Sequence, residues 1–222
     1  MLDLKQLTTD VCRIATDVGY FLKEERKNFR RERVVEEHAH DYVTYVDKES
    51  EVRVVKALTA LLPEAGFITE EGSATYQDEP YCWVIDPLDG STNYIHDEAP
   101  YCVSIALRSR TELLLGVVYE VCRDECFYAW KGGKAFMNGE EIHVSSVEDI
   151  QDAFVITELP YNHLQYKQTA LHLFDQLYGV VGGIRMNGSA AAAICYVAIG
   201  RFDAWMEAFL GKWDYSAAAL IV

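Results

Sequence analysis

The sequence contains no run of about 18 apolar residues, so it predicts no transmembrane helix. It is also poor in positive charge, with 20 Lys and Arg against 35 Asp and Glu and a formal net charge of -15. Because nucleic acids and anionic membranes repel such a surface, we expect neither as a general partner. The first residues lack a basic segment followed by an apolar one, which argues against a secretory signal.

Two further absences limit the chemistry. None of the six cysteines forms a C-x-x-C pair, and most lie in apolar runs. This favours buried, reduced thiols in a cytoplasmic protein. The Gly-rich segment 182–189 has neither G-x-G-x-x-G nor a Walker lysine, so the common nucleotide-binding fingerprints are missing.

The first part of the chain favours helices. Apolar residues recur at three- and four-residue spacing from Leu4 to Leu22, which predicts a long amphipathic helix. The mixed-charge segment 23–38 is interpreted as a solvated helix end and connector. A second helix is expected from about Lys48 to Leu62, where Pro63 ends it.

The predicted secondary structure changes from helices to strands from residue 81 onward. Segments rich in β-branched and aromatic residues predict four strands, at 81–85, 101–108, 113–121 and 126–130. Asn138-Gly139 predicts a hairpin turn. The later segments alternate between the two types: strand 152–157, helix 163–178, strand 182–186, helix 188–200, strand 202–209 and helix 213–222.

This pattern predicts a layered α/β (α+β) fold. With 222 residues, half of them hydrophobic, the chain is long enough to bury a sizeable core. We expect a single domain, 1–222, of two lobes that divide near residue 145: about 1–145 and about 146–222. The chain stops at Val222 inside an apolar helical run, and we expect that C-terminal residues of a longer protein are missing.

The segment WVIDPLDGSTN places two carboxylates, Asp86 and Asp89, at the end of a predicted buried strand. Gly90 permits a tight turn after them, and Ser91 or Thr92 suits a helix N-cap. Clustered oxygen ligands bind hard cations such as Mg²⁺, and a helix N-terminus beside them would add an anion site. A D-x-x-D-G segment alone also occurs in structural turns and calcium loops.

Three other acidic segments extend this constellation. TEEG carries Glu70 and Glu71, DYVTYVD ends in Asp47, and KWDYSAAA places Asp214 at the start of a helix. Each of these acids, taken alone, would most often be a helix cap or a surface charge.

Together, the four segments resemble the inositol monophosphatase family of Mg²⁺-dependent, lithium-sensitive phosphatases. They match its D-x-V-T-x-x-D, G-E-E, W-x-I-D-P-x-D-G-T-x-N-F and W-D-x-A-A motifs in order. GGKAFMNGEEIHVS and MNGSAAAAICYVAIGRFDAW resemble the family's hairpin and its substrate-pocket segment, so the similarity covers essentially the whole chain. It implies the αβαβα sandwich of the sugar phosphatase superfamily, with its C-terminal part missing here.

The resemblance implies a metal-dependent mechanism. Two Mg²⁺ ions, with a third in some arrangements, would be held by five residues: Glu70, Asp86, the backbone carbonyl of Leu88, Asp89 and Asp214. Asp86 would bridge the two ions. Asp47, Ser91 and Glu70 would form the catalytic group, in which Asp47 and the Ser91 hydroxyl orient or deprotonate the attacking water.

The resemblance also implies how the substrate binds. The Gly90 and Ser91 amides would receive the phosphate, while Gly188, Ser189 and Glu207 would face the alcohol part. The expected activity is hydrolysis of inositol monophosphate or a related polyol or sugar phosphate in the cytoplasm, by a homodimer that binds no nucleic acid polymer and no membrane.

Other functions stay open at this point. The alternatives within the superfamily are sister activities on 3′,5′-bisphosphonucleotides, fructose 1,6-bisphosphate or histidinol phosphate. Outside it, the chain could be a metal-binding or regulatory protein without turnover. Two positions depart from the family pattern: Ser91 replaces Thr, and Glu36 replaces Lys, which puts a third metal in doubt. Glu207 mildly favours a hydroxyl-rich substrate, because its carboxylate can accept hydrogen bonds.

Overall fold

The structure is a computed structural model that describes residues 2–29, 35–38, 41–159 and 163–222, with the backbone alone at 35–38 and 41–43. The side chain of Glu36 therefore lies outside the described residues. The segments 35–38 and 41–43 form an antiparallel pair, β1 (Val35–His38) and β2 (Asp41–Val43), which the sequence pattern did not predict.

The larger sheet contains seven strands in the order β3-β4-β5-β6-β7-β8-β9. Strand β3 runs parallel to β4, and the other neighbouring pairs are antiparallel. All four segments predicted as strands between residues 81 and 130 lie in this sheet. Its strands are β3 (Ala65–Thr69), β4 (Tyr81–Asp89), β5 (Cys102–Ser109), β6 (Leu113–Glu120), β7 (Glu125–Trp130), β8 (Ala135–Met137) and β9 (Glu140–Glu141).

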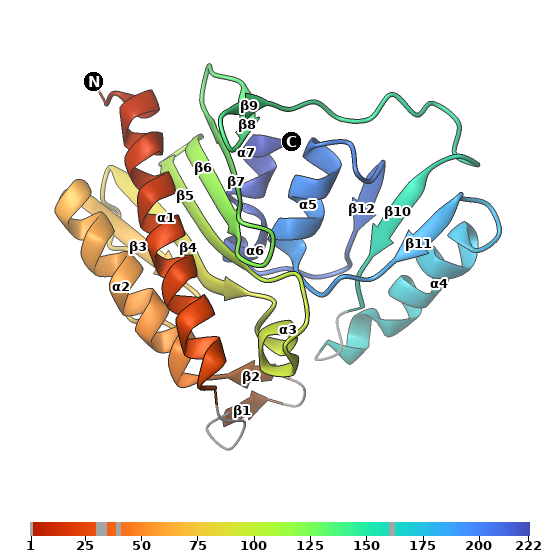
Figure 1. Cartoon of the computed structure of the whole chain (residues 1–222), viewed down its shortest axis with the longest axis horizontal. Helices are drawn as coiled ribbons and strands as arrows, with labels where there is room; N and C mark the ends of the chain where they lie inside the picture. The colour runs from red at the N-terminus through yellow and green to blue at the C-terminus, as the bar shows by residue number, and fades with distance from the viewer. Residues whose placement is uncertain (1, 30–34, 39–40, 160–162) are drawn as a thin grey trace.

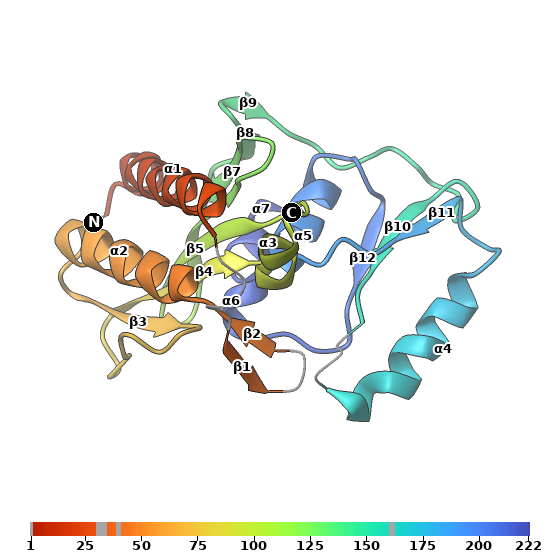
Figure 2. The ribbon, with the colours of Figure 1, turned by 60° about the horizontal axis from the view of Figure 1, so that its bottom comes forward.

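Two long helices, α1 (Leu4–Lys27) and α2 (Tyr45–Leu61), cover one face of this sheet (Figures 1 and 2). Most of the predicted apolar stripe of α1 is buried there, in one core with sheet residues such as Trp83 and Ile85. Helix α1 ends at Lys27, within the mixed-charge segment that was interpreted as its solvated end and the following connector. The basic last turn, Arg26 and Lys27, suits the negative end of the helix dipole.

The opposite face packs on α5 (Ala190–Ala198), α6 (Lys212–Tyr215) and α7 (Ala218–Ile221). Side chains alternate between the two faces along β4, so Cys82 and Val84 join this second core. The helix expected at 213–222 is thus two short helices. The Ser216 hydroxyl donates to the Lys212 carbonyl at 2.6 Å, a side-chain bond that disturbs regular helix geometry.

A smaller parallel sheet lies beyond these helices, in the order β11-β10-β12. It consists of β10 (Phe154–Thr157), β11 (Gly183–Arg185) and β12 (Ala204–Met206), the last shorter than predicted. The 3₁₀ turn η2 (Leu164–Tyr166) and α4 (Lys167–Leu177) lie outside it. Figure 1 shows the resulting succession of helix, sheet, helix, sheet and helix layers, which confirms the predicted α/β class. The division into lobes near residue 145 stays a prediction.

Local predictions met mixed outcomes. The hairpin turn is confirmed, since Asn138 and Gly139 both have positive φ, at 50° and 92°. All six cysteines are free, but Cys122 is exposed and Cys12 and Cys126 are half-buried, so burial of these thiols was wrongly expected. No helix in the described part of the chain has the length and apolar content needed to cross a membrane.

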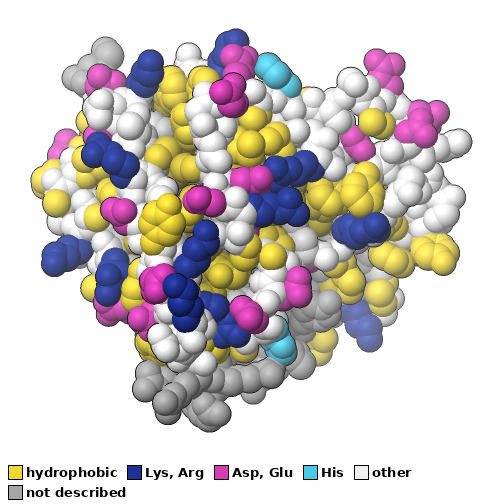
Figure 3. All heavy atoms as spheres, in the orientation of Figure 1, with side chains coloured by type: hydrophobic (Ala, Val, Ile, Leu, Met, Phe, Trp, Pro, Cys, Tyr) yellow, Lys and Arg dark blue, Asp and Glu magenta, His cyan; other side chains and the backbone are white. Residues whose placement is uncertain are grey.

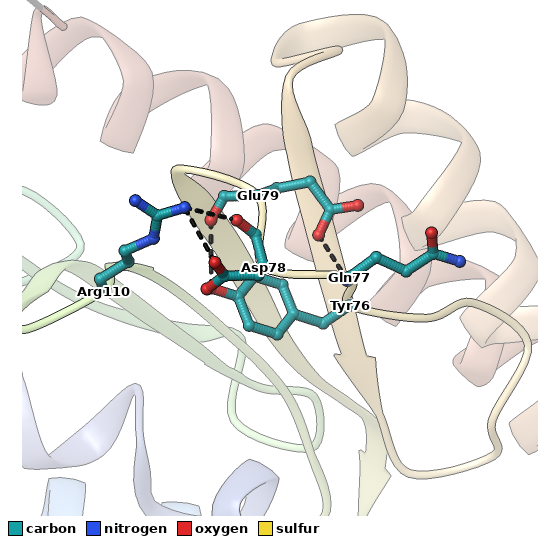
Figure 4. Close-up of polar contacts among 5 residues, drawn as sticks. All are labelled: Tyr76, Gln77, Asp78, Glu79 and Arg110. Atoms are coloured by element: carbon teal, nitrogen blue, oxygen red, sulfur yellow. Dashed lines mark hydrogen bonds and ion pairs between the residues drawn. The ribbon is translucent and has the colours of Figure 1, made fainter.

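The connection from β3 to β4 ends in an exposed polar cluster (Figure 4). An Arg110 Nη2 donates to the backbone carbonyl of Asp78 at 2.8 Å and to its carboxylate at 3.0 Å. The Glu79 carboxylate accepts the Gln77 N–H at 2.6 Å. Surface charges of both signs are interspersed on the face in Figure 3, so the net charge does not form one continuous acidic surface there.

Candidate active site

The carboxyl ends of β3 and β4 meet, because the two strands are parallel and in register. Glu70 directly follows β3, and its N–H donates to the Ile85 carbonyl of β4 at 3.2 Å. Strand β4 continues past the predicted end at Ile85 and reaches Asp89. Its pairing with β5 shifts between Asp86 and Asp89, where Pro87 supplies no N–H for a regular ladder.

Asp86 is the most deeply buried acid of this edge, with 1% of its surface exposed. Its Oδ1 accepts the Leu88 N–H at 3.0 Å. Burial raises the pKa of Asp86 well above its usual range, and the negative charges of Glu70, Asp89 and Asp214 raise it further. The four acids therefore lie within electrostatic reach of one another.

Glu70 reaches the surface, yet protein surrounds much of its carboxylate. The loss of hydration raises the pKa of Glu70 well above its usual range, and the charges of Asp214 and Asp47 act in the same direction. The Glu70 and Asp86 carboxyls each affect the pKa of the other, and the charge of Glu70 raises the pKa of Asp86. This is the expected response of two unneutralised carboxylates at close range.

Asp214 arrives from the opposite layer on α6. Its Oδ2 accepts the Gly211 N–H at 2.6 Å, which fixes it in the first turn of the helix. The Ser104 hydroxyl of β5 donates to the Trp213 carbonyl at 3.2 Å and ties this turn to the larger sheet. Burial and the charge of Asp89 raise the pKa of Asp214 to about 7.

Asp47 lies in the first turn of α2 and forms a capping box with Thr44. Its Oδ2 accepts the Thr44 N–H at 2.8 Å and the Thr44 hydroxyl at 2.5 Å. Burial raises the pKa of Asp47 to about 6, although these bonds lower it. Its effect on the pKa of Glu70 places it near the cluster. The structure has no hydrogen bond between the described side chains of Asp47 and Ser91.

Asp89 turns toward the N-terminus of α5. Its carboxylate accepts the Ser189 hydroxyl at 2.5 Å, the Ala191 N–H at 2.7 Å and the Ala190 N–H at 3.3 Å. Burial raises the pKa of Asp89 to about 6, and these bonds partly oppose the rise. The predicted metal ligand Asp89 and the predicted substrate residue Ser189, 100 positions apart, are thus directly paired.

Two glycines bring the surrounding backbone segments together. Gly90 has φ 92°, and a Cβ there would lie 2.9 Å from the Pro100 carbonyl. Gly188 has φ 74°, and a Cβ there would lie 2.9 Å from the Asn93 side chain. The short helix α3 (Ser91–His96) begins after Gly90, its N-cap residue, so the expectation of Ser91 or Thr92 as N-cap was wrong.

The substrate-side residues predicted from the sequence adjoin the smaller sheet. Glu207 follows β12, and burial raises its pKa to about 8, assisted by the charges of Glu158, Asp89 and Asp214. Gly188 and Ser189 precede α5. The side chain of Ser189 is buried and donates to Asp89, whereas Glu207 keeps partial exposure.

Sequence reasoning missed the side chains that hold the backbone segments around the site, at 187–188 and 71–73. Glu158, directly after β10, accepts the Asn187 and Gly188 N–H groups at 2.7 and 3.1 Å. Asn93 donates to the Asn187 carbonyl at 2.7 Å. Glu51, on α2, accepts two amides of the segment after Glu70. An acid directly after a predicted strand was a usable signal for Glu158, as it was for Asp86.

The donor chemistry of the cluster fits a hard divalent cation. All its side-chain donors are carboxylate oxygens, and their mutual repulsion, visible in the raised pKa values, would be relieved by a bound cation. In their present positions, no three His, Cys, Asp or Glu side chains among the described residues converge on one ion. Asp89 instead accepts hydrogen bonds from the Ser189 hydroxyl and from the first amides of α5. The predicted ligand and substrate roles stay predictions.

The chain is similar to known proteins over most of its length. The model of the inositol monophosphatase family matches residues 3–222. The chain is 39% identical over 194 residues to "Nus factor SuhB" of Pseudomonas aeruginosa, covering 85% of this chain and 72% of the relative. It is 34% identical over 204 residues to "Fructose-1,6-bisphosphatase/inositol-1-monophosphatase" of Aquifex aeolicus, covering 92% and 77%.

A solved structure is similar as well. The crystal structure of extragenic suppressor protein suhB from Bartonella henselae has a TM-score of 0.90 and 32% identity, covering 96% of this chain and 83% of that one. The layered architecture and the sequence similarity therefore relate this chain to the same group of proteins.

Proposed function

Because this chain belongs to the inositol monophosphatase family, we propose that it is a Mg²⁺-dependent phosphomonoester hydrolase. Its substrate would be inositol monophosphate or a related polyol or sugar phosphate. The observation that carries the proposal is the cluster of Glu70, Asp86, Asp89 and Asp214, whose charges raise one another's pKa values. Among the described residues, no Lys or Arg forms an ion pair with any of the four.

Five residues would hold the metal: Glu70, Asp86, the carbonyl of Leu88, Asp89 and Asp214. Bound Mg²⁺ would lower the pKa of water and stabilise negative charge on the phosphate and leaving oxygens. Asp47 would accept the proton of the attacking water with the Ser91 hydroxyl beside it. A pKa of about 6 leaves Asp47 mostly ionised at neutral pH and close to the range that suits a general base. Thr44 orients the Asp47 carboxylate through its N–H and hydroxyl.

The remaining predicted residues would position the substrate. The Gly90 and Ser91 amides would receive the phosphate. Gly90 has a left-handed conformation and no side chain, so a phosphate could approach its backbone closely. Gly188, Ser189 and Glu207 would line the alcohol side. An ionised Glu207 accepts a hydrogen bond from a ring hydroxyl, whereas its protonated form, favoured by a pKa of about 8, can also donate one.

Two sets of alternatives have support. The Aquifex aeolicus relative, named for two substrates, supports fructose 1,6-bisphosphate beside inositol 1-phosphate. The relatives named Nus factor SuhB support a second candidate of another class, a binding or regulatory protein that keeps the acidic cluster without turnover. The expected absence of nucleic acid binding stays a prediction for the same reason.

The test is phosphate release from a substrate panel, with Mg²⁺ and with EDTA in its place. The panel contains inositol 1-phosphate, fructose 1,6-bisphosphate, a 3′,5′-bisphosphonucleotide and histidinol phosphate. We expect Mg²⁺-dependent release that is strongest on inositol 1-phosphate. Release that is strongest on another member would keep the reaction and change the substrate. Folded protein that binds Mg²⁺ and releases phosphate from none of them would overturn the proposal in favour of the binding function.

A further inference from the structure

Helix α2 carries a second buried acid, one turn after Asp47. Glu51 has 0% of its surface exposed, and among the described residues no Lys or Arg forms an ion pair with it. Its Oε2 accepts the Glu71 N–H at 2.8 Å, and its Oε1 accepts the Ser73 N–H, also at 2.8 Å. Both oxygens of a buried carboxylate are therefore committed to one backbone segment, 20 or more positions away.

That segment is the turn that follows Glu70. Gly72, with φ 71°, lies between the two donors, so Glu51 holds the turn on both sides of its left-handed residue. The Glu70 N–H is bonded to the Ile85 carbonyl of β4 at 3.2 Å. The backbone of Glu70 is thus fixed by β4 through its own N–H and by Glu51 through the N–H of the next residue.

We infer that Glu51 is a positioning residue for Glu70. By fixing the turn after β3, its carboxylate keeps the Glu70 side chain directed at Asp86 and sets the affinity of the acidic cluster for Mg²⁺. One helix then serves the site twice, since Asp47 lies one turn before Glu51 on α2. The metal part of this inference rests on the proposed function, whereas the backbone part rests on the two hydrogen bonds alone.

The first test is Glu51→Gln in the full chain. Glutamine keeps the size of the side chain but offers one acceptor oxygen, so one of the two amides loses its partner. Groups that orient a metal ligand typically change metal affinity by about 10- to 100-fold when mutated. We expect the Mg²⁺ dissociation constant, measured by calorimetry with Mg²⁺ alone, to rise by roughly that factor. Hydrogen exchange at Glu71 and Ser73 should accelerate, with little change in substrate KM at saturating Mg²⁺.

The matched control is Glu49→Gln on the same helix. Glu49 is half exposed, at 49% for its side chain, and pairs with Arg53 at 3.0 Å. The same chemical change there should leave Mg²⁺ affinity and exchange at Glu71 and Ser73 unaltered. Folded Glu51→Gln protein that binds Mg²⁺ as tightly as the wild type would overturn the inference.

A measurement on the wild-type protein tests the inference even if the Glu51→Gln variant does not fold. If Glu51 couples the turn to the metal, saturating Mg²⁺ must slow exchange at Glu71 and Ser73. Exchange that is indifferent to Mg²⁺, in protein shown to bind it, would contradict the coupling. Failure of the proposed function is distinguishable, because wild-type protein would then bind Mg²⁺ without phosphate release, and the affinity and exchange comparisons still decide the role of Glu51.

Discussion

The two ends of strands β3 and β4 carry acids in contrasting surroundings. At the amino end of β4, Asp78 is exposed, at 77% for its side chain, and Arg110 supplies a positive partner at 3.0 Å (Figure 4). At the carboxyl end, Asp86 is buried among three other acids. No Lys or Arg in the described residues forms an ion pair with any member of that cluster.

The contrast is between an acid that pairs with a positive side chain of the protein and acids that have no such partner among the described residues. The second group is available to a bound cation. Exposed ion pairs contribute little to stability, about 0–1 kcal/mol, so Asp78 and Arg110 mainly close a loop. Buried, unneutralised carboxylates cost free energy of folding, and proteins that keep them generally use them. We therefore expect the carboxyl end of β4 to be the functional end, and the amino end serves as its internal control.

Asp86→Asn should produce the largest effect. Asparagine keeps the oxygen that accepts the Leu88 N–H but removes the charge proposed to bridge the metals. Because bound Mg²⁺ would supply several kcal/mol of transition-state stabilisation, we expect kcat to fall by roughly 10³-fold or more. Metal-free protein should become more stable by about 1–3 kcal/mol at pH 8, since a repelled buried charge is gone. Phosphate release and urea unfolding in EDTA measure the two quantities.

A variant that loses turnover without gaining metal-free stability would show that Asp86 is not repelled by its neighbours. A variant that keeps full Mg²⁺-dependent turnover would remove Asp86 from the metal site. Either result would show that the acids at the two ends of β4 do not differ in the proposed way.

The pH dependence of metal-free stability should show the next largest effect. Burial raises the pKa of Asp47 and Asp89 to about 6 and that of Asp214 to about 7. Their unfolded pKa values lie near 4, so the folded state binds more protons between pH 4 and 7. Stability is therefore greatest at the acidic end of that window and falls as pH rises through it, by up to about 1.4 kcal/mol per pH unit for each group.

Added Mg²⁺ should reverse this trend, because a cation replaces the protons and binds better as they leave. Urea unfolding at pH 5, 6, 7 and 8, in EDTA and in Mg²⁺, gives the comparison. Metal-free stability that rises steadily from pH 5 to 8 would contradict the raised pKa values.

Much of the site could be predicted from the sequence because its acids lie in short ordered segments. Asp86 and Asp89 follow a recognisable apolar strand, and the Asn138-Gly139 turn carries its own conformational signal. Strand β3 was missed, since AGFIT is short and contains a Gly, without the alternation that marks a half-buried strand.

The partners of these acids were not predictable in the same way. Asp89 meets Ser189 across 100 positions, and Glu51 meets Glu71 across 20. Such pairs form when layers pack, and no local spacing in either segment encodes them. Sequence reasoning therefore found the acids to which we assign the chemistry and missed the buried acids that hold loops in place.

Asp78→Asn should give the smallest effect, as the same chemical change at the opposite end of β4. The bond from Arg110 to the Asp78 backbone carbonyl at 2.8 Å survives the substitution. The exposed ion pair with Arg110 is weakened, and so is the bond from the Tyr76 hydroxyl to the Asp78 carboxylate at 3.5 Å. We expect the free energy of unfolding to change by less than about 0.5 kcal/mol, with kcat and Mg²⁺ affinity unaltered. If Asp78→Asn lowered turnover as much as is expected for Asp86→Asn, the loss would be explained by a general disturbance of strands β3 and β4. It would then not be evidence for a metal site at Asp86. An unaltered Asp78→Asn enzyme would instead support a site at the end where no described Lys or Arg forms an ion pair with the acids.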